Sequence, residues 1–127
     1  MGADMTQEAA IQTFLGGFGI PAYATASVPD DAEFPYITYD LTVGTWGSGE
    51  SNLVVNAWFR TDSEAIPNAF VRVVSNAIGI GGVTLPCDGG MLWVKRGVPW
   101  SQAVLATGDD EKVKRRYLNI DIEFLVI

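Results

Sequence analysis

The stretch "LVVNAWFRTDSEAIPNAFVRVVSNAIG", Leu53 to Gly79, joins a strand pattern directly to a helix pattern. Its first eight residues are rich in β-branched and aromatic side chains, which predicts a strand over about 51–60. Beyond Asp62 or Ser63, which would cap a helix over about 63–78, apolar residues recur at intervals of three and four. These apolar positions are Ala65, Ile66, Ala69, Phe70, Val73, Val74, Ala77 and Ile78. A strand followed by such a helix predicts a domain that contains both kinds of element.

Elements of both kinds also flank this stretch. An apolar stripe at helical spacing predicts a short helix over about 5–15, and period-two alternation predicts a strand over about 36–45. A turn rich in glycine predicts a hairpin over about 82–96, and a second alternating run predicts a final strand over about 114–126. One more short strand is possible near Tyr23. The order predicts an α+β fold, with a mainly antiparallel sheet and both helices packed on one face.

Length and composition fit a single domain over residues 1–127, because 48% of the residues are hydrophobic, enough for one core. Every charged residue before Arg60 is acidic, so the net charge of −7 arises in the first half. This balance argues against tight binding of nucleic acid. The single cysteine, Cys87, excludes an intrachain disulfide. We expect a soluble protein without a signal peptide or membrane span.

The segment "NAIGIGGVTLPCDGG", Asn76 to Gly90, has the glycines of a phosphate-binding loop but the wrong order of elements. Such loops follow a strand and open a helix, whereas this segment follows a helix and opens a strand. We therefore interpret Gly79 as a helix stop and Gly89 as part of a hairpin turn. Cys87 has no histidine to activate it, and Asp88 would disfavour its thiolate, so a structural role is favoured.

Two acidic clusters, Asp30, Asp31 and Glu33 in one and residues 109–111 in the other, offer oxygen ligands for a divalent cation. Neither cluster has the spacing of a calcium-binding loop, so we predict no metal site and no cofactor. The sequence also contains no histidine and no nucleophile motif, which argues against an enzyme. An enzyme that uses carboxylates stays an alternative, with Asp88, Asp109 and Asp110 as the residues to replace.

The run "KVKRR" is the only concentration of basic residues, at Lys112, Lys114, Arg115 and Arg116. One interpretation is a solvated loop that the neighbouring acids neutralise. The other is a docking surface for the acidic face of a neighbouring copy, because head-to-tail contacts close into rings. On the second interpretation, reversing Arg115 and Arg116 to glutamate would leave the fold intact and impair ring closure.

The four tryptophans divide into two pairs by their surroundings. Trp46 and Trp100 lie in turn-like stretches beside glycine or proline, where exposed tryptophan favours an interface, although core positions are at least as plausible. Trp58 and Trp93 lie inside predicted strands, and we expect them in the core. Trp46 and Trp100 are therefore candidate interface residues together with the basic run.

Four phrases follow one another in a recognisable order: "FGIPAYATASVPDDAEFPYITYDL", "NAWFRTDS", "GGVTLPCDGGMLWVKRGVPWSQ" and "DDEKVKRRYLNIDIEFL". In this order the chain resembles the small tail proteins of the head-tail joining cluster of long-tailed phages and prophages, of the tail terminator or tail-completion type. The resemblance extends from about Ile11 to Phe124. It rests on the phrases and their order and includes no catalytic signature.

The resemblance implies an α+β subunit that forms a ring, commonly a hexamer, on the end of the tail tube. Such a ring stops tube polymerisation and joins the tail to the connector proteins of the head, and it needs no cofactor. DNA would pass through without specific binding, and the protein would belong to the virion tail, assembled in the bacterial cytoplasm. An acidic lumen would include Asp30, Asp31 and Glu33, or the tip near Glu50. The alternatives are a head-closure or neck subunit and a small-molecule-binding domain that uses the sheet face and the tryptophans.

Overall fold

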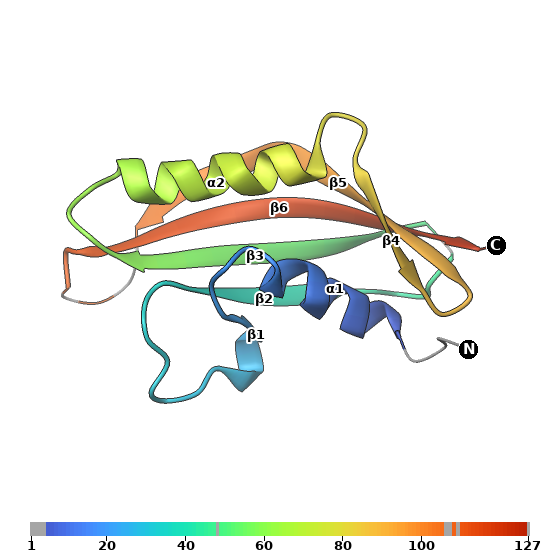
Figure 1. The fold of residues 1–127 in the computed structure, drawn as a ribbon, viewed down its shortest axis with the longest axis horizontal. Coiled ribbons are helices and arrows are strands. Elements are labelled where there is room, and N and C mark those ends of the chain that lie inside the picture. Colours follow the sequence, from blue (N-terminus) through green and yellow to red (C-terminus); the bar gives the residue numbers. More distant parts are fainter. Residues whose placement is uncertain (1–4, 48, 106–107, 109, 127) are drawn as a thin grey trace.

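The computed structural model describes residues 5–47, 49–105, 108 and 110–126. Two helices and six strands follow one another along the chain (Figure 1). In chain order they are α1 (Gln7–Gly16), β1 (Ala22–Ala24), β2 (Tyr36–Thr42), β3 (Glu50–Arg60), α2 (Ala65–Ile78), β4 (Val83–Cys87), β5 (Gly90–Leu105) and β6 (Val113–Val126). A single 3-10 turn, Thr25–Ser27, follows β1. The predicted α+β class is confirmed, and the short strand near Tyr23 is β1.

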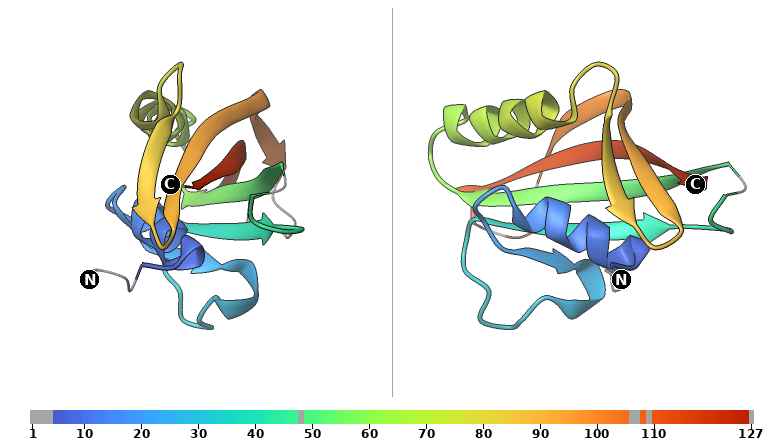
Figure 2. Two further views of the ribbon diagram at one scale, coloured as in Figure 1. Left: turned by 90° about the vertical axis from the view of Figure 1, so that its right-hand side faces the viewer. Right: turned by 45° about the vertical axis from the view of Figure 1, so that its right-hand side comes forward.

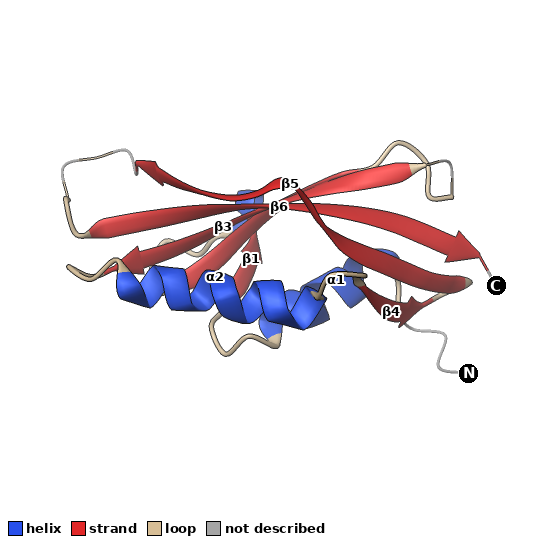
Figure 3. Cartoon of the chain, turned by 90° about the horizontal axis from the view of Figure 1, so that it is seen from above, coloured by secondary structure: helices blue, strands red, loops and turns tan. Residues whose placement is uncertain are grey.

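The strands form one sheet in the order β1-β2-β3-β6-β5-β4. Every neighbouring pair is antiparallel except β1 and β2, which are parallel. Both helices lie on the same side of the sheet, which Figure 3 shows when the molecule is seen from above. No α-helix packs on the opposite face within the described residues, and the 3-10 turn Thr25–Ser27 lies at its β1–β2 edge, where Thr25 Oγ1 donates a hydrogen bond of 2.9 Å to Asp40 Oδ2. The sheet curls at its β4 end, so that β4 and the start of β5 wrap toward α1 (Figure 2).

The core lies between the helices and the sheet. Strand residues alternate between the two faces, so one set of aliphatic side chains points toward the helices. The buried members of this set are Ile37, Leu53, Val55, Leu92, Val94, Leu118, Ile120 and Ile122. The helices contribute Ile11, Leu15, Val74 and Ile78. Burying a side chain of this size stabilises the fold by about 1.5–3 kcal/mol, so this layer is the main source of stability.

The helix ends differ slightly from those expected from the sequence. Thr6 caps α1, because its Oγ1 accepts a hydrogen bond of 3.1 Å from the N–H of Ala9. At the start of α2, the Oγ of Ser63 accepts a hydrogen bond of 3.2 Å from the N–H of Ala65. The N-cap residue is nevertheless Glu64, which forms no side-chain capping bond, so the expected cap at Asp62 or Ser63 is wrong and the helix begins at Ala65. Gly79 ends α2 with a φ of 76°, which favours glycine.

The largest difference from the sequence-based prediction is in β5. The hairpin was expected over about 82–96, whereas β5 continues to Leu105. An irregularity between Arg96 and Ser101 separates its two halves, and beyond it the strand pairs with residues 114–118 of β6. The second half has no clear period in its own sequence. Its strand conformation is therefore recognised only from its pairing with β6. At the other end of the sheet, β2 ends at Thr42, earlier than the expected 45.

Candidate functional site

The face of the sheet opposite the helices carries a row of aromatic side chains. Tyr36 on β2 and Trp58 on β3 are direct partners in the sheet, and their rings stack with centroids 6.5 Å apart. Trp58 donates a hydrogen bond of 2.9 Å from Nε1 to the Oγ1 of Thr38. Phe34 continues the row beyond the strand, with its ring centroid 5.3 Å from that of Tyr36. This row forms one end of the uncovered face.

Arg115 extends the row onto β6. Its guanidinium carbon lies 5.2 Å from the centroid of the Trp58 ring, and its Nε donates a hydrogen bond of 2.8 Å to the Oδ1 of Asn56. Asn56 and Thr38 are buried although they point away from the helices, because the larger side chains of this face cover them. Of the predicted interface residues in the basic run, Arg115 is thus the one that belongs to the uncovered face.

Arg116 points to the opposite side, beneath α2, and the expectation that it is a surface docking residue is wrong. Its side chain is only 7% exposed. Its guanidinium donates hydrogen bonds to Glu64 Oε1 at 2.6 Å and to Asn68 Oδ1 at 3.0 Å. The alternation of side chains along β6 separates Arg115 from Arg116, so adjacent arginines have different environments.

The two lysines of the run also have partners within the chain. Lys112 lies 3.8 Å from a carboxylate oxygen of Asp62, and Lys114 lies 3.8 Å from one of Glu64. The hydrogen bond from Arg116 lowers the pKa of Glu64, and the positive charges of Arg116 and Lys114 add to this effect. Both of these acidic partners, Asp62 and Glu64, lie just before α2. The basic run is therefore largely neutralised within the chain, as the first of the two interpretations expected, although by different acids.

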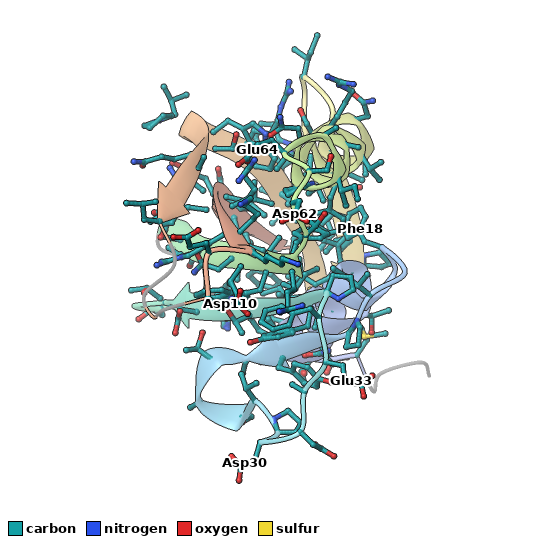
Figure 4. The ribbon with its side chains drawn as sticks, turned by 90° about the vertical axis from the view of Figure 1, so that its left-hand side faces the viewer. Phe18, Asp30, Glu33, Asp62, Glu64 and Asp110 are labelled. Carbon is teal, nitrogen blue, oxygen red and sulfur yellow. The ribbon has the colours of Figure 1, made fainter. Side chains whose placement is uncertain are left out.

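The predicted acidic residues do not form one surface. Asp30, Asp31 and Glu33 are exposed together on the loop between β1 and β2, and Figure 4 shows Asp30 and Glu33 at the lower edge of the molecule. Glu50 lies at the start of β3, where it forms an ion pair with Lys95. The hydrogen bond to Glu50 raises the pKa of Lys95. Among the described acidic residues before Arg60, Glu50 alone forms an ion pair.

The tryptophans do not follow the division expected from the sequence. Trp46 and Trp100 are half-buried and pack against the core, and the ring of Trp46 lies 6.4 Å from that of Phe124. Trp58 and Trp93 are half-buried on the uncovered face, so their predicted core positions are wrong. The Nε1 of Trp93 donates a hydrogen bond of 2.9 Å to the carbonyl of Gly81. Strand position alone does not distinguish the two faces of a sheet when both carry large side chains.

The glycine-rich segment forms a turn, as predicted. Cys87 and Gly90 are partners across the hairpin, and Gly89 has a φ of 80°. A Cβ atom on Gly90 would lie 1.9 Å from the carbonyl oxygen of Leu125, so a side chain cannot fit there. Burial raises the pKa of the Cys87 thiol, and the charge of Asp88 adds to this effect. Both effects disfavour the reactive thiolate.

The carboxylates considered for catalysis are occupied or separate. Asp110 accepts a hydrogen bond of 2.8 Å from Arg60, which lowers the pKa of its carboxyl group, with a second contribution from the N–H of Lys112. Asp109 lies outside the described residues. Within the described ranges, no three histidine, cysteine, aspartate or glutamate residues are placed to hold a metal ion. Nothing in this arrangement resembles a paired acid and base.

Several shallow hollows open on the surface of the described structure. One of about 380 Å³ lies between the end of β5 and the start of β6, and its lining includes Glu64, Asp110, Lys114, Arg115 and Arg116. Another, of about 330 Å³, lies between α1 and the β1–β2 edge. Tryptophan side chains line neither of these two hollows in the described structure, so they do not match the pocket expected for a small-molecule-binding domain.

The sequence analysis missed a set of exposed apolar residues on α2, in the loop between α2 and β4, and on β5. The exposed fractions are 53% for Ile66, 54% for Val73, 98% for Ile80, 94% for Val98 and 92% for Leu105. In α2 the apolar positions form two stripes, of which Pro67, Val74 and Ile78 are buried and Ile66 and Val73 are not. The signal was present in the sequence, because apolar residues at paired positions cover more than one face of a helix.

We compared the chain with protein-family models and with curated proteins, and neither comparison gives a match. In the part of the chain that the structure describes, no helix is long and apolar enough to cross a membrane.

Proposed function

We propose that this protein is a structural subunit of a phage or prophage tail. In this proposal copies of the chain form a ring, of six subunits as the family resemblance implies, that caps the tail tube, ends its polymerisation and joins the tail to the head. The order of phrases from Ile11 to Phe124 supports the family assignment. The partners would be other copies of the chain, the tail-tube protein and a head-tail connector protein.

The observation that carries the proposal is a set of exposed apolar residues on α2, in the loop after it and on β5. An apolar side chain that is almost fully exposed gains the most free energy when a partner in an assembly covers it. Ile80, Val98 and Leu105 are each more than nine-tenths exposed. A subunit that is buried in an assembly would cover them.

The charge distribution supports the same assignment. Asp30, Asp31 and Glu33 are exposed and have no ion-pair partner among the described residues. Carboxylates that are unpaired within one chain are available to a positive charge of a neighbouring copy, as assembly into a ring requires. No catalytic step and no cofactor are part of this proposal.

Electron microscopy with polymerised tail-tube protein from the same phage genome tests the function. We expect the protein to add a ring at one end of each tube and to stop further growth when fresh tube protein is supplied. Bovine serum albumin at the same concentration serves as the control for nonspecific blocking. A protein that neither binds tube ends nor limits tube length would refute the proposal.

A head-closure or neck subunit is the second candidate. Such subunits also form rings, and the sequence phrases quoted above do not separate them from tail terminators. Such a subunit would bind the portal end of filled heads and leave the growth of tubes unchanged. The same tube experiment therefore separates the two functions. A small-molecule-binding domain receives no support from the hollows described above.

A further inference from the structure

The second half of β5 is an open edge of the sheet. β4 pairs only with residues 90–94 of β5, so residues 101–105 have β6 on one side and no strand on the other within the described structure. The segment from Gly97 to Gly108 contains no charged residue. Proteins commonly protect such edges with lysine, proline or a covering element. In β5, Pro99 lies just before the paired residues 101–105. Leu105, at the end of the strand, is 92% exposed, so the edge is uncovered at this residue.

The outer stripe of α2 lies on the same side of the molecule as this edge. Figure 3, which shows the molecule from above, presents both α2 and β5 to the viewer. Arg96 of β5 donates a hydrogen bond of 2.7 Å to the Oγ of Ser75 and so ties the strand to the helix. Arg72 is exposed on α2 and forms no ion pair or hydrogen bond with the described residues. We call Ile66, Arg72, Val73, Ile80 and residues 98–105 the upper surface.

The loop between β1 and β2 lies at the opposite edge of the sheet. Figure 2 shows α2 at the top of the molecule and this loop at the bottom. Asp30, Asp31 and Glu33 are exposed there, together with Phe34, which is 38% exposed. We call residues 28–35 the acidic loop. It combines negative charge with an exposed aromatic ring, whereas the upper surface combines a free arginine with exposed aliphatic side chains.

We propose that the upper surface of one copy binds the acidic loop of the next copy in the ring. The inference rests on the proposed function and names its subunit interface. Asp30 and Asp31 would approach Arg72, and Phe34 would pack among the exposed aliphatic side chains. The two surfaces complement each other in charge and in polarity, and within the described residues Arg72, Asp30 and Asp31 form no ion pair.

The position of the two surfaces explains why the partner is a second copy in head-to-tail arrangement. Two upper surfaces that met each other would bring Arg72 against Arg72 and leave both acidic loops without a partner. A contact between different surfaces at opposite edges repeats from one copy to the next and closes into a ring when the rotation permits. Lys112, Lys114 and Arg116 are paired within the chain and are not needed for this contact.

Cysteine cross-linking tests the contact directly, because Cys87 is the only native cysteine. In a C87S background, we would combine Val73→Cys on α2 with Asp31→Cys on the acidic loop and add a short bismaleimide. A head-to-tail contact yields a ladder of covalent multimers up to the size of the ring. The chains with only one of the two cysteines are the matched controls and should yield no ladder. The reaction is run on the protein alone and on tubes capped by it.

A charge exchange provides an independent readout of the same contact. Arg72→Glu should weaken self-association by about fivefold, the upper range for an exposed ion pair. Adding Asp31→Lys to that chain should restore it, as measured by sedimentation. Folding is checked by thermal melting, which both substitutions should leave unchanged because both residues are exposed.

Each outcome separates this inference from the proposed function. Rings without a ladder would overturn the inferred interface and leave the tail function in place. A ladder from a protein that never caps tubes would support the interface and refute the tail function. Dimers from the Val73→Cys chain alone would reveal a symmetric contact and overturn the head-to-tail arrangement. A strict monomer, alone and with tubes, would overturn both.

Discussion

Arg116 is the side chain whose environment most constrains mutagenesis of this protein. Its guanidinium lies beneath α2, where Glu64 and Asn68 accept its hydrogen bonds. A glutamate at this position would place an uncompensated negative charge near Glu64 in a site that is 7% exposed. The paired reversal of Arg115 and Arg116 therefore cannot test an interface, because the expected intact fold would be lost.

Replacing Arg116 by glutamate should lower the free energy of unfolding by about 1–3 kcal/mol, since it removes the hydrogen bonds of a buried guanidinium to Glu64 and Asn68 and places a carboxylate there. Arg72→Glu is the matched control: the same exchange on an exposed residue should change stability by less than about 0.5 kcal/mol. Urea unfolding followed by tryptophan fluorescence measures both. Equal stability of the two variants would mean that Arg116 contributes nothing through its partners.

At the scale of elements, α2 carries two apolar stripes with different roles. Val74 is 2% exposed and packs in the core, whereas its neighbour Val73 is 54% exposed. Both were expected on one apolar face, because their spacing fits the helical period. The sheet below α2 contacts only one side of the helix, which leaves Val73 on the outer stripe.

The same substitution at these adjacent residues should therefore have unequal effects. Val74→Ala removes two buried methyl groups and should cost about 2 kcal/mol of unfolding free energy. Val73→Ala should change the stability of the isolated chain by less than about 0.5 kcal/mol. Thermal or urea unfolding at a concentration where the protein is monomeric provides the measurement. Similar losses at both positions would show that the outer stripe is also covered in the monomer.

The length of β5 depends on its partner and not on its own pattern. Residues 101–105 include no regular alternation of polar and apolar side chains, yet they pair with residues 114–118 of β6. The alternating pattern of β6 is strong, so its position could be predicted, but a pattern in one strand does not identify the strand beside it. Pairing between segments that are distant in sequence depends on the whole sheet.

Across the whole molecule, the acidic residues that form ion pairs lie in three places. Asp62 and Glu64 lie just before α2, Glu50 and Glu123 lie on β3 and β6, and Asp110 lies just before β6. Because its pKa is lowered in the folded state, Glu64 stabilises the fold fully above the unfolded-state pKa of about 4.3. This stabilisation is lost as the pH falls through the lower folded-state pKa. Glu33, in contrast, has no ion pair within the described residues.

The acid dependence of stability should therefore distinguish these two glutamates. Between about pH 5 and pH 2.5, the urea midpoint of the native protein should fall more than that of Glu64→Gln, because the variant has no carboxylate to protonate at this site. Glu33→Gln controls for the change in net charge and should retain the acid dependence of the native protein. If the urea midpoints of all three proteins fell equally as the pH was lowered, the contact between Glu64 and Arg116 would contribute nothing to the acid dependence of stability.

The sequence alone determined the α+β class, the order of the elements and the glycine turn, because hydrophobic periodicity and turn residues act within a few residues of chain. It also identified Asp30, Asp31 and Glu33 as one exposed group. Only the tertiary structure decided which side of α2 is covered, that β5 continues along β6, and that Arg115 and Arg116 point to opposite faces. The tertiary structure also decided which acidic residues pair with Lys112 and Lys114. The physical reason is that burial, strand pairing and ion pairing arise between segments far apart in the chain.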